Sequence, residues 1–276
     1  MKRVGIVGLG WLGIPLAQSL MASGVRVVGS KTTHDGVEAA RMCGIESYLL
    51  ELTPEPQCEA DDLAALLSVD ALVITLPASR TAAGGEGYLR SVQALVDSAL
   101  AFNVARIIFT SSTSVYGERS GIVNENSNLT PVTVAGRTLQ ELENWLHDLP
   151  HTSVDILRLA GLVGPKRHPG RFLAGKEALG NGGQGVNLVH LDDVIAAIRL
   201  LLQSPTGGHI YNLCAPGHPA RAQFYPTVAR QLGLTPPTFI SEEGFVEGGK
   251  IVDGSKICRE LGFTYTYPHP ETMPLS

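Results

Sequence analysis

The sequence is poor in cysteine, the residue that cross-links small extracellular domains and builds many zinc sites. Its four cysteines, Cys43, Cys58, Cys214 and Cys258, are scattered and form no CxxC pair. Such thiols fit neither a zinc site nor a dense disulfide framework. We therefore expect no metal site, reduced cysteines and a cytoplasmic protein.

Long apolar runs and clustered charges of one sign are also lacking. Beyond the N-terminal residues, no segment approaches the roughly 18 uninterrupted apolar residues of a membrane span. The formal net charge is −5, and like charges do not gather into runs. Because a surface that binds polyanions needs a concentrated basic patch, we expect neither nucleic acid nor a membrane as a partner.

The N-terminal residues imitate a secretory signal peptide. Lys2 and Arg3 precede an apolar run that ends in small residues. Four glycines and Pro15 interrupt this run, however, and a helical signal segment tolerates such residues poorly. We favour a ligand-binding turn as the reason for the glycines, with a signal peptide as the alternative.

Apolar segments of strand length alternate with segments of helical periodicity. We expect strands at 4–7, 26–28, 47–50, 71–76, 106–109 and 154–159, and helices at 14–22, 39–42, 61–67, 89–101, 140–147 and 194–202. Continuous apolar strands separated by helices are typical of a parallel sheet covered on both faces. The sequence therefore predicts an α/β fold with a doubly wound parallel sheet.

Glycine- and proline-containing stretches concentrate after residue 160. We expect the dinucleotide-binding region at residues 1–160. Residues 161–276 are then expected to add the remaining sheet elements and a small C-terminal substrate-binding lobe, within a single structural unit.

The glycines near the N-terminus follow a spacing with a known physical meaning. Gly8-Leu9-Gly10-Trp11-Leu12-Gly13 matches GxGxxG between an expected strand and an expected helix, which is the context that the dinucleotide fingerprint requires. The first glycine permits a tight turn, the second lets the backbone approach a pyrophosphate, and the third lets the helix pack on the strand. The helix N-terminus then offers N–H groups to the phosphates. We predict a Rossmann fold that binds a nicotinamide dinucleotide here; a purely structural turn is the alternative.

The end of the second expected strand bears on the choice of cofactor. Proteins that bind NAD place Asp or Glu about 20 residues after the glycines. Here the stretch Gly29-Ser30-Lys31-Thr32-Thr33 contains no carboxylate. A hydroxyl beside a cation suits a 2′-phosphate, so we favour NADP over NAD. Lysine is a point charge rather than a fork, and a solvated surface lysine is the alternative reading of Lys31.

Further segments resemble the extended short-chain dehydrogenase/reductase superfamily, the proteins similar to NAD-dependent epimerases and dehydratases. They are TSSTSVYG at 110–117, LRLAGLVGP at 157–165, NLVHLDDV at 187–194 and YNL at 211–213, and the stretch 29–33 resembles the YeeZ-like group of atypical members. The resemblance spans nearly the whole chain. It implies a Rossmann sheet, a small substrate lobe and a homodimer built from helices 89–101 and 140–147. Apolar stripes on such helices also occur where they simply face the core.

The resemblance implies cofactor contacts at further strand ends. Glu51 and Leu52, after the third strand, stand where family members contact the adenine. The full set of expected cofactor-binding residues is Gly8, Gly10, Trp11, Leu12, Gly13, Ser30, Lys31, Thr32, Glu51, Leu52, Leu76 and Pro77.

The catalytic dyad of the family is where this chain departs from the pattern. Ser112 stands at the position of the residue that polarises the substrate. The family's YxxxK helix start, laid without a gap on residues 131–143, puts Ala135 in the place of tyrosine and Leu139 in the place of lysine. The phenol normally transfers a proton while hydride moves, and the lysine lowers its pKa. Alanine and leucine do neither, so the usual mechanism is expected to be absent.

Two other side chains are candidates for proton transfer besides Ser112. Tyr116 supplies a phenol, and His190 supplies an imidazole that titrates near neutral pH. The alternatives are structural: a packed Tyr116 ring with a satisfied hydroxyl, and a His190 beside Asp192 or Asp193 that caps a helix starting at residue 194.

The densest positive cluster falls where the family has its substrate loop. Arg167, His168 and Arg171 are expected to hold a carboxylate or phosphate of a small anionic ligand, and solvated loop charge is the alternative. The overlapping run 170–176 matches most of GxxxxGK[ST], but Glu177 replaces the hydroxyl that ligates Mg²⁺. We therefore do not expect an ATP site.

Two functions from different classes follow. The first is an NAD(P)-dependent oxidoreductase or epimerase-like enzyme that acts on a small metabolite without the usual dyad. The second is a non-catalytic NAD(P)H-binding redox sensor or regulatory protein. The retained serine motif and the basic loop favour the first, and the missing dyad favours the second.

Overall fold

The computed structural model describes residues 3–78, 84–240 and 248–275, which form two compact units. The first unit comprises Met1–Val115, Pro131–Arg158 and Ile195–Ile210, and the second comprises Tyr116–Thr130, Leu159–Val194 and Tyr211–Ser276. Each unit is thus built from three separate segments, because later strands and helices of the chain return to the sheet of the first unit.

A seven-stranded sheet organises the fold in the order β12-β9-β7-β6-β1-β2-β3. Its strands are β1 (Arg3–Val7), β2 (Arg26–Lys31), β3 (Glu46–Leu49), β6 (Ala71–Ile74), β7 (Arg106–Ser112), β9 (Ser153–Leu159) and β12 (Ile210–Leu213). Strand β1 pairs in parallel with both β2 and β6. The chain moves outward from β1 on one side and then on the other, so the direction of winding switches between β1 and β6. In such sheets ligands bind at the carboxyl ends of the strands beside this switch.

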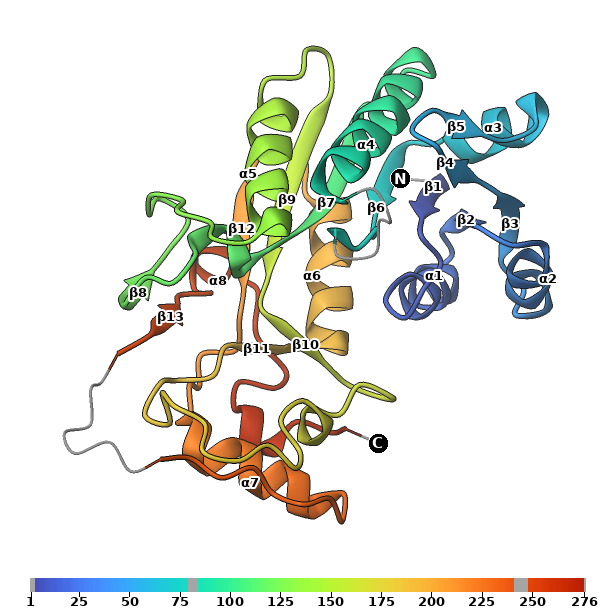
Figure 1. Cartoon of the computed structure of the whole chain (residues 1–276). Coiled ribbons are helices and arrows are strands. Elements are labelled where there is room, and N and C mark those ends of the chain that lie inside the picture. Colours follow the sequence, from blue (N-terminus) through green and yellow to red (C-terminus); the bar gives the residue numbers. More distant parts are fainter. Residues whose placement is uncertain (1–2, 79–83, 241–247, 276) are drawn as a thin grey trace. The chain divides into compact units, whose positions relative to one another are not determined.

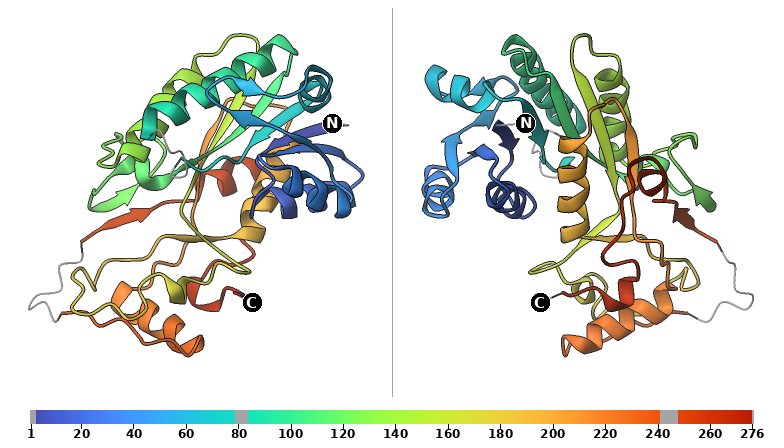
Figure 2. Two further views of the ribbon diagram at one scale, coloured as in Figure 1. Left: turned by 45° about the vertical axis from the view of Figure 1, so that its right-hand side comes forward. Right: turned by 180° about the vertical axis from the view of Figure 1, so that it is seen from behind.

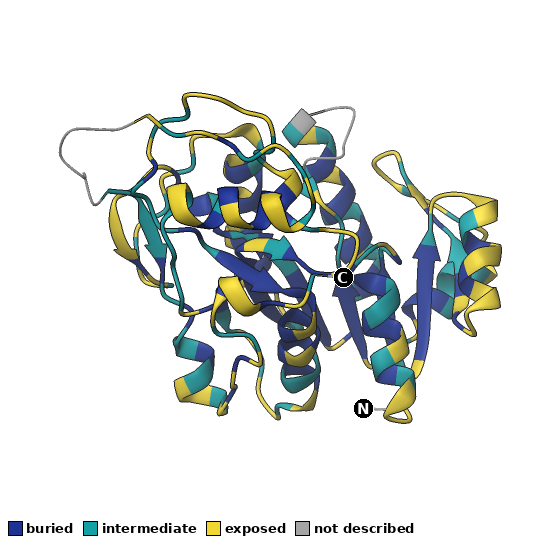
Figure 3. Ribbon diagram, turned by 90° about the horizontal axis from the view of Figure 1, so that it is seen from below, coloured by how far each residue is buried: buried dark blue, intermediate teal, exposed yellow. Residues whose placement is uncertain are grey.

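Helices cover both faces of the sheet. They are α1 (Gly13–Ala22), α2 (His34–Met42), α3 (Ala60–Leu67), α4 (Gly84–Ala101), α5 (Val134–His147) and α6 (Leu191–Gln203). In Figures 1 and 2, α3, α4 and α5 lie on one face, and α1, α2 and α6 lie on the other. The four residues of β6 are completely buried between these layers, as Figure 3 shows for the sheet in general. The α/β fold predicted from the sequence is confirmed.

Several elements extend beyond their expected ends. Helix α5 begins at Val134 rather than 140, because the hydroxyl of Thr133 accepts the N–H of Gly136 at 3.0 Å and caps an earlier turn. Helix α6 begins at Leu191 rather than 194. Strand β2 continues to Lys31 because β3 pairs with its last residues.

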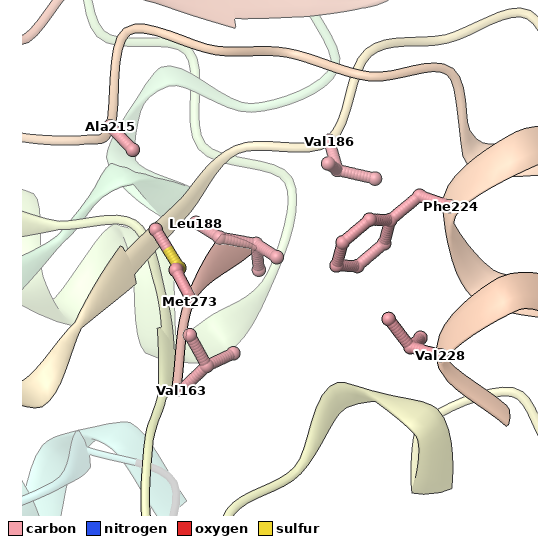
Figure 4. Close-up of a cluster of buried hydrophobic side chains, with 7 residues drawn as sticks. All are labelled: Val163, Val186, Leu188, Ala215, Phe224, Val228 and Met273. Atoms are coloured by element: carbon pink, nitrogen blue, oxygen red, sulfur yellow. The ribbon is translucent and has the colours of Figure 1, made fainter. Parts of the chain in front are cut away.

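The second unit contains shorter elements around a core of its own. Strand β10 (Gly161–Val163) pairs with β11 (Leu188–His190), and β13 (Lys250–Val252) pairs with β8 (Gly121–Val123). Its helices are α7 (Arg221–Gln231) and α8 (Lys256–Leu261), with short 3-10 turns η3 (Pro169–Arg171) and η4 (Pro270–Thr272). A buried cluster of Val163, Val186, Leu188, Ala215, Phe224, Val228 and Met273 joins α7 to these strands (Figure 4).

The run that imitates a signal peptide begins at Met1 and Lys2, which lie outside the described residues. From Arg3 onward it forms strand β1, the glycine loop and helix α1. In the ranges 3–78, 84–240 and 248–275, no helix has the length and apolar character needed to span a membrane.

Candidate functional site

The glycine loop connects β1 to α1 at the switch point of the sheet (Figure 1). Gly8 has a φ of +104°, a conformation that side chains rarely adopt. Its N–H donates to the hydroxyl oxygen of Ser30 at 3.3 Å, and its carbonyl oxygen accepts the hydroxyl of Thr75 at 2.6 Å. The side chain of Leu9 is buried against β2, where a β-carbon on Gly29 would lie 2.6 Å from it. The loop is therefore held by both neighbouring strands.

The three glycines of the fingerprint have different local surroundings. A β-carbon on Gly13 would overlap the carbonyl oxygen of Gly8, so Gly13 is required for packing. A β-carbon on Gly10 would meet no atom of the described residues within 4 Å. Gly10 is also exposed, and its φ is not in the left-handed region. Packing within the chain does not explain a glycine at position 10, whereas a ligand that approaches the backbone does.

The loop also leads into the N-terminus of a ten-residue helix. Trp11 is half-buried and Leu12 is 8% exposed immediately before α1. In the first turn of α1, the Ile14 and Leu16 N–H groups donate to the carbonyl oxygens of Gly10 and Leu12, both at 3.1 Å, and Pro15 has no N–H. The helix therefore favours an anion at this end mainly through its dipole. Together with the open face of Gly10, this arrangement fits the pyrophosphate of a dinucleotide.

The end of β2 differs from the sequence expectation in one respect. Ser30 is only 4% exposed, and its hydroxyl oxygen is engaged by the Gly8 N–H. Lys31, the last residue of β2, is half-buried, and its Cδ would lie 3.3 Å from a β-carbon on Gly36 of α2. Thr32 is exposed, and Thr33 caps α2 by accepting the Gly36 N–H at 3.1 Å. Lys31 therefore lies beside the N-terminus of α2, while Ser30 faces the glycine loop.

The remaining expected cofactor contacts also follow strands of the first unit. Glu51 and Leu52 form β4, which pairs with β5 (Pro56–Gln57) directly after β3. Leu76 and Pro77 follow β6, and the Leu76 carbonyl accepts the hydroxyl of Tyr88 at 2.7 Å. Strands β3 and β6, which precede these residues, end at the same edge of the sheet as β1, where the glycine loop begins.

Ser112 ends β7 at the same edge of the first unit. Its hydroxyl oxygen accepts the N–H of Ser114 at 3.1 Å, which fixes the oxygen and leaves the hydroxyl hydrogen for donation. The preceding residue, Ser111, donates instead to a buried carboxylate, Glu143, at 2.6 Å. Glu143 in turn pairs with Arg158 at 2.7 Å, with both side chains 4% exposed or less. The two serines thus face different partners, and Ser112 is the one whose proton can polarise a substrate oxygen.

Ala135 and Leu139, which the sequence pattern predicts in place of the family dyad, lie on α5. Ala135 is half-buried, and Leu139 is 4% exposed. Neither side chain can transfer a proton or carry a charge.

Tyr116 and His190 belong to the second unit and make structural contacts there. Tyr116 is fully buried, and its hydroxyl donates to Oδ1 of Asn212 at 2.7 Å. Nε2 of His190 lies 2.7 Å from the carbonyl oxygen of Pro274, and Nδ1 accepts the N–H of Asp192 at 3.1 Å. These contacts favour the structural alternative for both residues.

The two aspartates after His190 have opposite surroundings. Asp193 is fully buried and accepts the N–H groups of Thr266 at 2.7 Å and Tyr267 at 3.1 Å. The side chain of Asp192 is 58% exposed. Burial raises the pKa of Asp193, and the two N–H donors partly offset this. Because α6 begins at Leu191, both aspartates lie inside its first turn, and neither is the N-cap that the sequence suggested. Asp193 instead anchors the C-terminal segment.

The basic loop is a tight turn of the second unit. Gly164 and Arg167 exchange backbone hydrogen bonds, and Arg167 and Arg171 are exposed. His168 caps η3, with Nδ1 accepting the N–H of Gly170 at 2.9 Å. Burial, and secondarily the Arg171 guanidinium, lower the pKa of His168. The structure brings the three expected residues into one short loop in which Arg167 and Arg171 are exposed.

A separate hollow of about 160 Å³ lies along α7 in the second unit. Its lining residues are Pro219, Gln223, Phe224, Thr227, Val228, Gln231 and Glu271. None of them was expected from the sequence to bind cofactor or substrate. In the described parts of the chain, no three His, Cys, Asp or Glu side chains are grouped to hold a metal ion.

Thr75 is the residue at the glycine loop that sequence reasoning overlooked. It directly follows β6 at the switch point, and its N–H donates to the carbonyl oxygen of Val7 at 3.0 Å. A polar residue after the apolar strand 71–74 was the available signal. Its partner, Gly8, lies 67 residues earlier in the chain.

Sequence comparison connects the chain with known proteins. The profile of the NAD dependent epimerase/dehydratase family matches residues 4–214. Protein YeeZ of Escherichia coli K12 is 66% identical over 275 residues, which cover 100% of both chains. The uncharacterized UDP-glucose epimerase YtcB of Bacillus subtilis is 26% identical over 52% of each chain.

Solved structures share the fold at lower identity. UDP-glucose 4-epimerase of Thermotoga maritima with UDP-glucose superposes with a TM-score of 0.76 at 18% identity, over 96% of this chain and 94% of that one. A short-chain dehydrogenase/reductase superfamily protein of Agrobacterium tumefaciens with bound NAD also gives 0.76, at 20% identity over 96% and 93%. Together with the profile match and the close relative, the Rossmann sheet and its glycine loop establish that the chain belongs to the NAD dependent epimerase/dehydratase family.

Proposed function

We propose that this protein binds a nicotinamide dinucleotide at the Gly8–Gly13 loop and acts as an oxidoreductase or epimerase-like enzyme on a small metabolite. The observation that carries the proposal is Gly10, which is open to solvent at the N-terminus of α1 although packing requires no glycine there. A pyrophosphate that approaches the backbone supplies the reason. The bound NAD of the Agrobacterium tumefaciens protein supports the same class of cofactor.

We favour NADP over NAD, and we assign the preference to Lys31 and Thr32. Lys31 lies beside the N-terminus of α2, where its ammonium and the helix dipole both favour a 2′-phosphate. The exposed Asp35 in the first turn of α2 opposes this charge. We therefore expect a moderate preference of about tenfold, at the lower end of what one charge-assisted contact provides.

For the chemical step we assign Ser112 the direct role. The Ser114 N–H holds its oxygen, so its proton can be donated to a carbonyl or alkoxide oxygen of the substrate while hydride moves. In the reducing direction the substrate carbon gains the hydride and its oxygen gains the Ser112 proton, and a solvent proton then restores the Ser112 hydroxyl. Tyr116 and His190 remain weaker candidates, because their polar atoms already have partners within the second unit.

The substrate class that fits the basic loop is a small anion. Arg167 and Arg171 are exposed residues, and guanidinium groups bind carboxylate or phosphate with paired hydrogen bonds. The pKa of His168 is lowered, so this residue contributes as a neutral group near pH 7. The UDP-glucose bound to the Thermotoga maritima epimerase carries phosphates of this kind.

A redox sensor or regulatory protein is the second candidate function, and Leu139 is the observation that favours it. Laid on the family pattern, its buried apolar side chain stands where the family has a lysine that lowers the pKa of the catalytic phenol. A protein that performs no proton transfer has no need of that effect.

One experiment separates the two functions. The purified protein is titrated with NADH and NADPH, and the preferred cofactor is then supplied, in oxidised and in reduced form, with a metabolite extract. We expect micromolar or tighter binding and depletion of one or a few anionic metabolites. Binding without any depletion by the unmodified protein supports the sensor, and no binding of either dinucleotide contradicts both functions.

We further propose a cytoplasmic homodimer. The four cysteines are free, and α4 packs directly on α5, the helix pair that the family uses between subunits. Light scattering in solution is expected to give the mass of two chains, and a one-chain mass contradicts the dimer.

A further inference from the structure

We propose that Ser30 and Thr75 are positioning residues whose hydroxyls hold the backbone on both sides of Gly8 in the conformation that receives the pyrophosphate. They would set the affinity for any dinucleotide without affecting the choice between NADH and NADPH. The inference rests on the cofactor binding proposed above.

The two hydroxyls act on opposite ends of the same residue. The Gly8 N–H donates to Oγ of Ser30 on β2 at 3.3 Å, and the Gly8 carbonyl oxygen accepts the Thr75 hydroxyl at 2.6 Å. The backbone of both residues is itself hydrogen-bonded to the β1 segment and its loop. The Ser30 carbonyl accepts the Leu9 N–H at 3.0 Å, and the Thr75 N–H donates to Val7 at 3.0 Å. Ser30 on β2 and Thr75 directly after β6 thus hold the two peptide groups that flank the Cα of Gly8.

Gly8 needs such support because glycine has little conformational preference of its own. Its φ of +104° is one of many that glycine can adopt. The orientation of its carbonyl also determines the rest of the loop, since the Gly10 N–H donates to the same oxygen at 2.8 Å. Gly13 packs against that oxygen as well. A rotation of the peptide group between Gly8 and Leu9 would therefore move both Gly10 and the start of α1.

The sequence suggested that Ser30 and Lys31 together recognise a 2′-phosphate, whereas this assignment gives the two residues separate roles. The hydroxyl oxygen of Ser30 is buried and turned toward Gly8, so it contributes to the phosphate loop. Lys31 lies beside α2 and carries the charge that a 2′-phosphate would recognise. Changes at Ser30 and Lys31 should consequently have different signatures.

The test measures dissociation constants for NADH and NADPH by calorimetry on Ser30→Ala, Thr75→Val and Thr75→Ser. We expect Ser30→Ala and Thr75→Val each to weaken both cofactors by the same factor, about three- to tenfold, since each removes one hydrogen bond. Thr75→Ser keeps the hydroxyl and should restore nearly normal binding. Thr152→Val is the matched control, because it removes a similar hydroxyl bond, 3.0 Å to the Val104 carbonyl, at the opposite end of the sheet. It should leave both constants unchanged.

Three outcomes would overturn the inference while the proposed function stands. The first is wild-type affinity in Thr75→Val, and the second is a Thr75→Ser variant as weak as Thr75→Val. The third is a Ser30→Ala variant that loses NADPH binding alone, which would mean that Ser30 contacts the 2′-phosphate. If the unmodified protein binds neither dinucleotide, the proposed function fails and this inference fails with it.

Discussion

Gly13 packs so closely on Gly8 that a β-carbon at position 13 would overlap the Gly8 carbonyl oxygen, whereas Gly10, two residues from Gly8, has open space around it. The contrast gives the two positions opposite mutational behaviour. Gly10→Val should abolish dinucleotide binding, because a branched side chain fills the space of the pyrophosphate. Its free energy of unfolding should change by less than about 0.5 kcal/mol. Calorimetry and chemical denaturation measure the two effects.

Gly13→Ala is the companion variant. The added methyl group meets backbone rather than a movable side chain, so it should destabilise the fold by about 1–3 kcal/mol.

The binding site itself depends on the result for Gly10→Val. Unaltered cofactor affinity in that variant would remove the main support for the site.

Lys31→Asp should erase or reverse the cofactor preference. The change replaces a cation beside the N-terminus of α2 with an acid that can accept the ribose 2′-hydroxyl of NADH. We expect NADPH to bind about tenfold to a hundredfold more weakly, with little loss for NADH. Equal affinities for the two cofactors in the unmodified protein would show that Lys31 is a surface residue without this role.

Ser112→Ala should lower the rate of turnover, whereas Tyr116→Phe should lower the stability of the fold. Once a substrate is identified, Ser112→Ala should reduce kcat by roughly a hundredfold or more with cofactor binding intact. Tyr116→Phe removes the hydroxyl that satisfies the buried Oδ1 of Asn212 and should cost about 1–3 kcal/mol of stability. Near-normal turnover by the double variant would place the chemistry elsewhere.

Asp193→Ala should loosen the C-terminal segment, and Asp192→Ala should not. The first leaves the N–H groups of Thr266 and Tyr267 without their acceptor, and we expect a loss of about 2–4 kcal/mol. The exposed Asp192 should contribute less than about 0.5 kcal/mol. Limited proteolysis near the C-terminus, together with denaturation curves, distinguishes the two, and equal effects would contradict the anchoring role.

Glu143→Gln should be strongly destabilising, because it leaves the buried guanidinium of Arg158 without a charged partner. Breaking a buried pair of this kind costs about 3–5 kcal/mol. The exposed pair of Arg90 and Glu86 on α4 provides the control, and Glu86→Gln should cost less than about 0.5 kcal/mol. Comparable midpoints of urea denaturation for the two variants would show that the buried pair contributes no more than the exposed one.

The sequence alone determined the fold and the cofactor loop. Alternating apolar strands and helices, and glycines at positions 8, 10 and 13, are local patterns, and local patterns report on backbone conformation. The segments between Thr110 and Leu213 indicated the family, because they follow one another in the order that is typical of its members. None of these features depends on which strand lies beside which.

Tertiary structure decided what the polar side chains do. Ser30 and Thr75 are 45 positions apart, and only the strand order β6-β1-β2 places their hydroxyls on the two ends of Gly8. The same holds for Tyr116 with Asn212, where the partner lies 96 residues away. A hydroxyl, a phenol or a carboxylate is compatible with catalysis, with ligand binding or with a buried hydrogen bond. Because the burial and the partner that distinguish these roles come from distant segments, they are fixed only when the sheet has assembled.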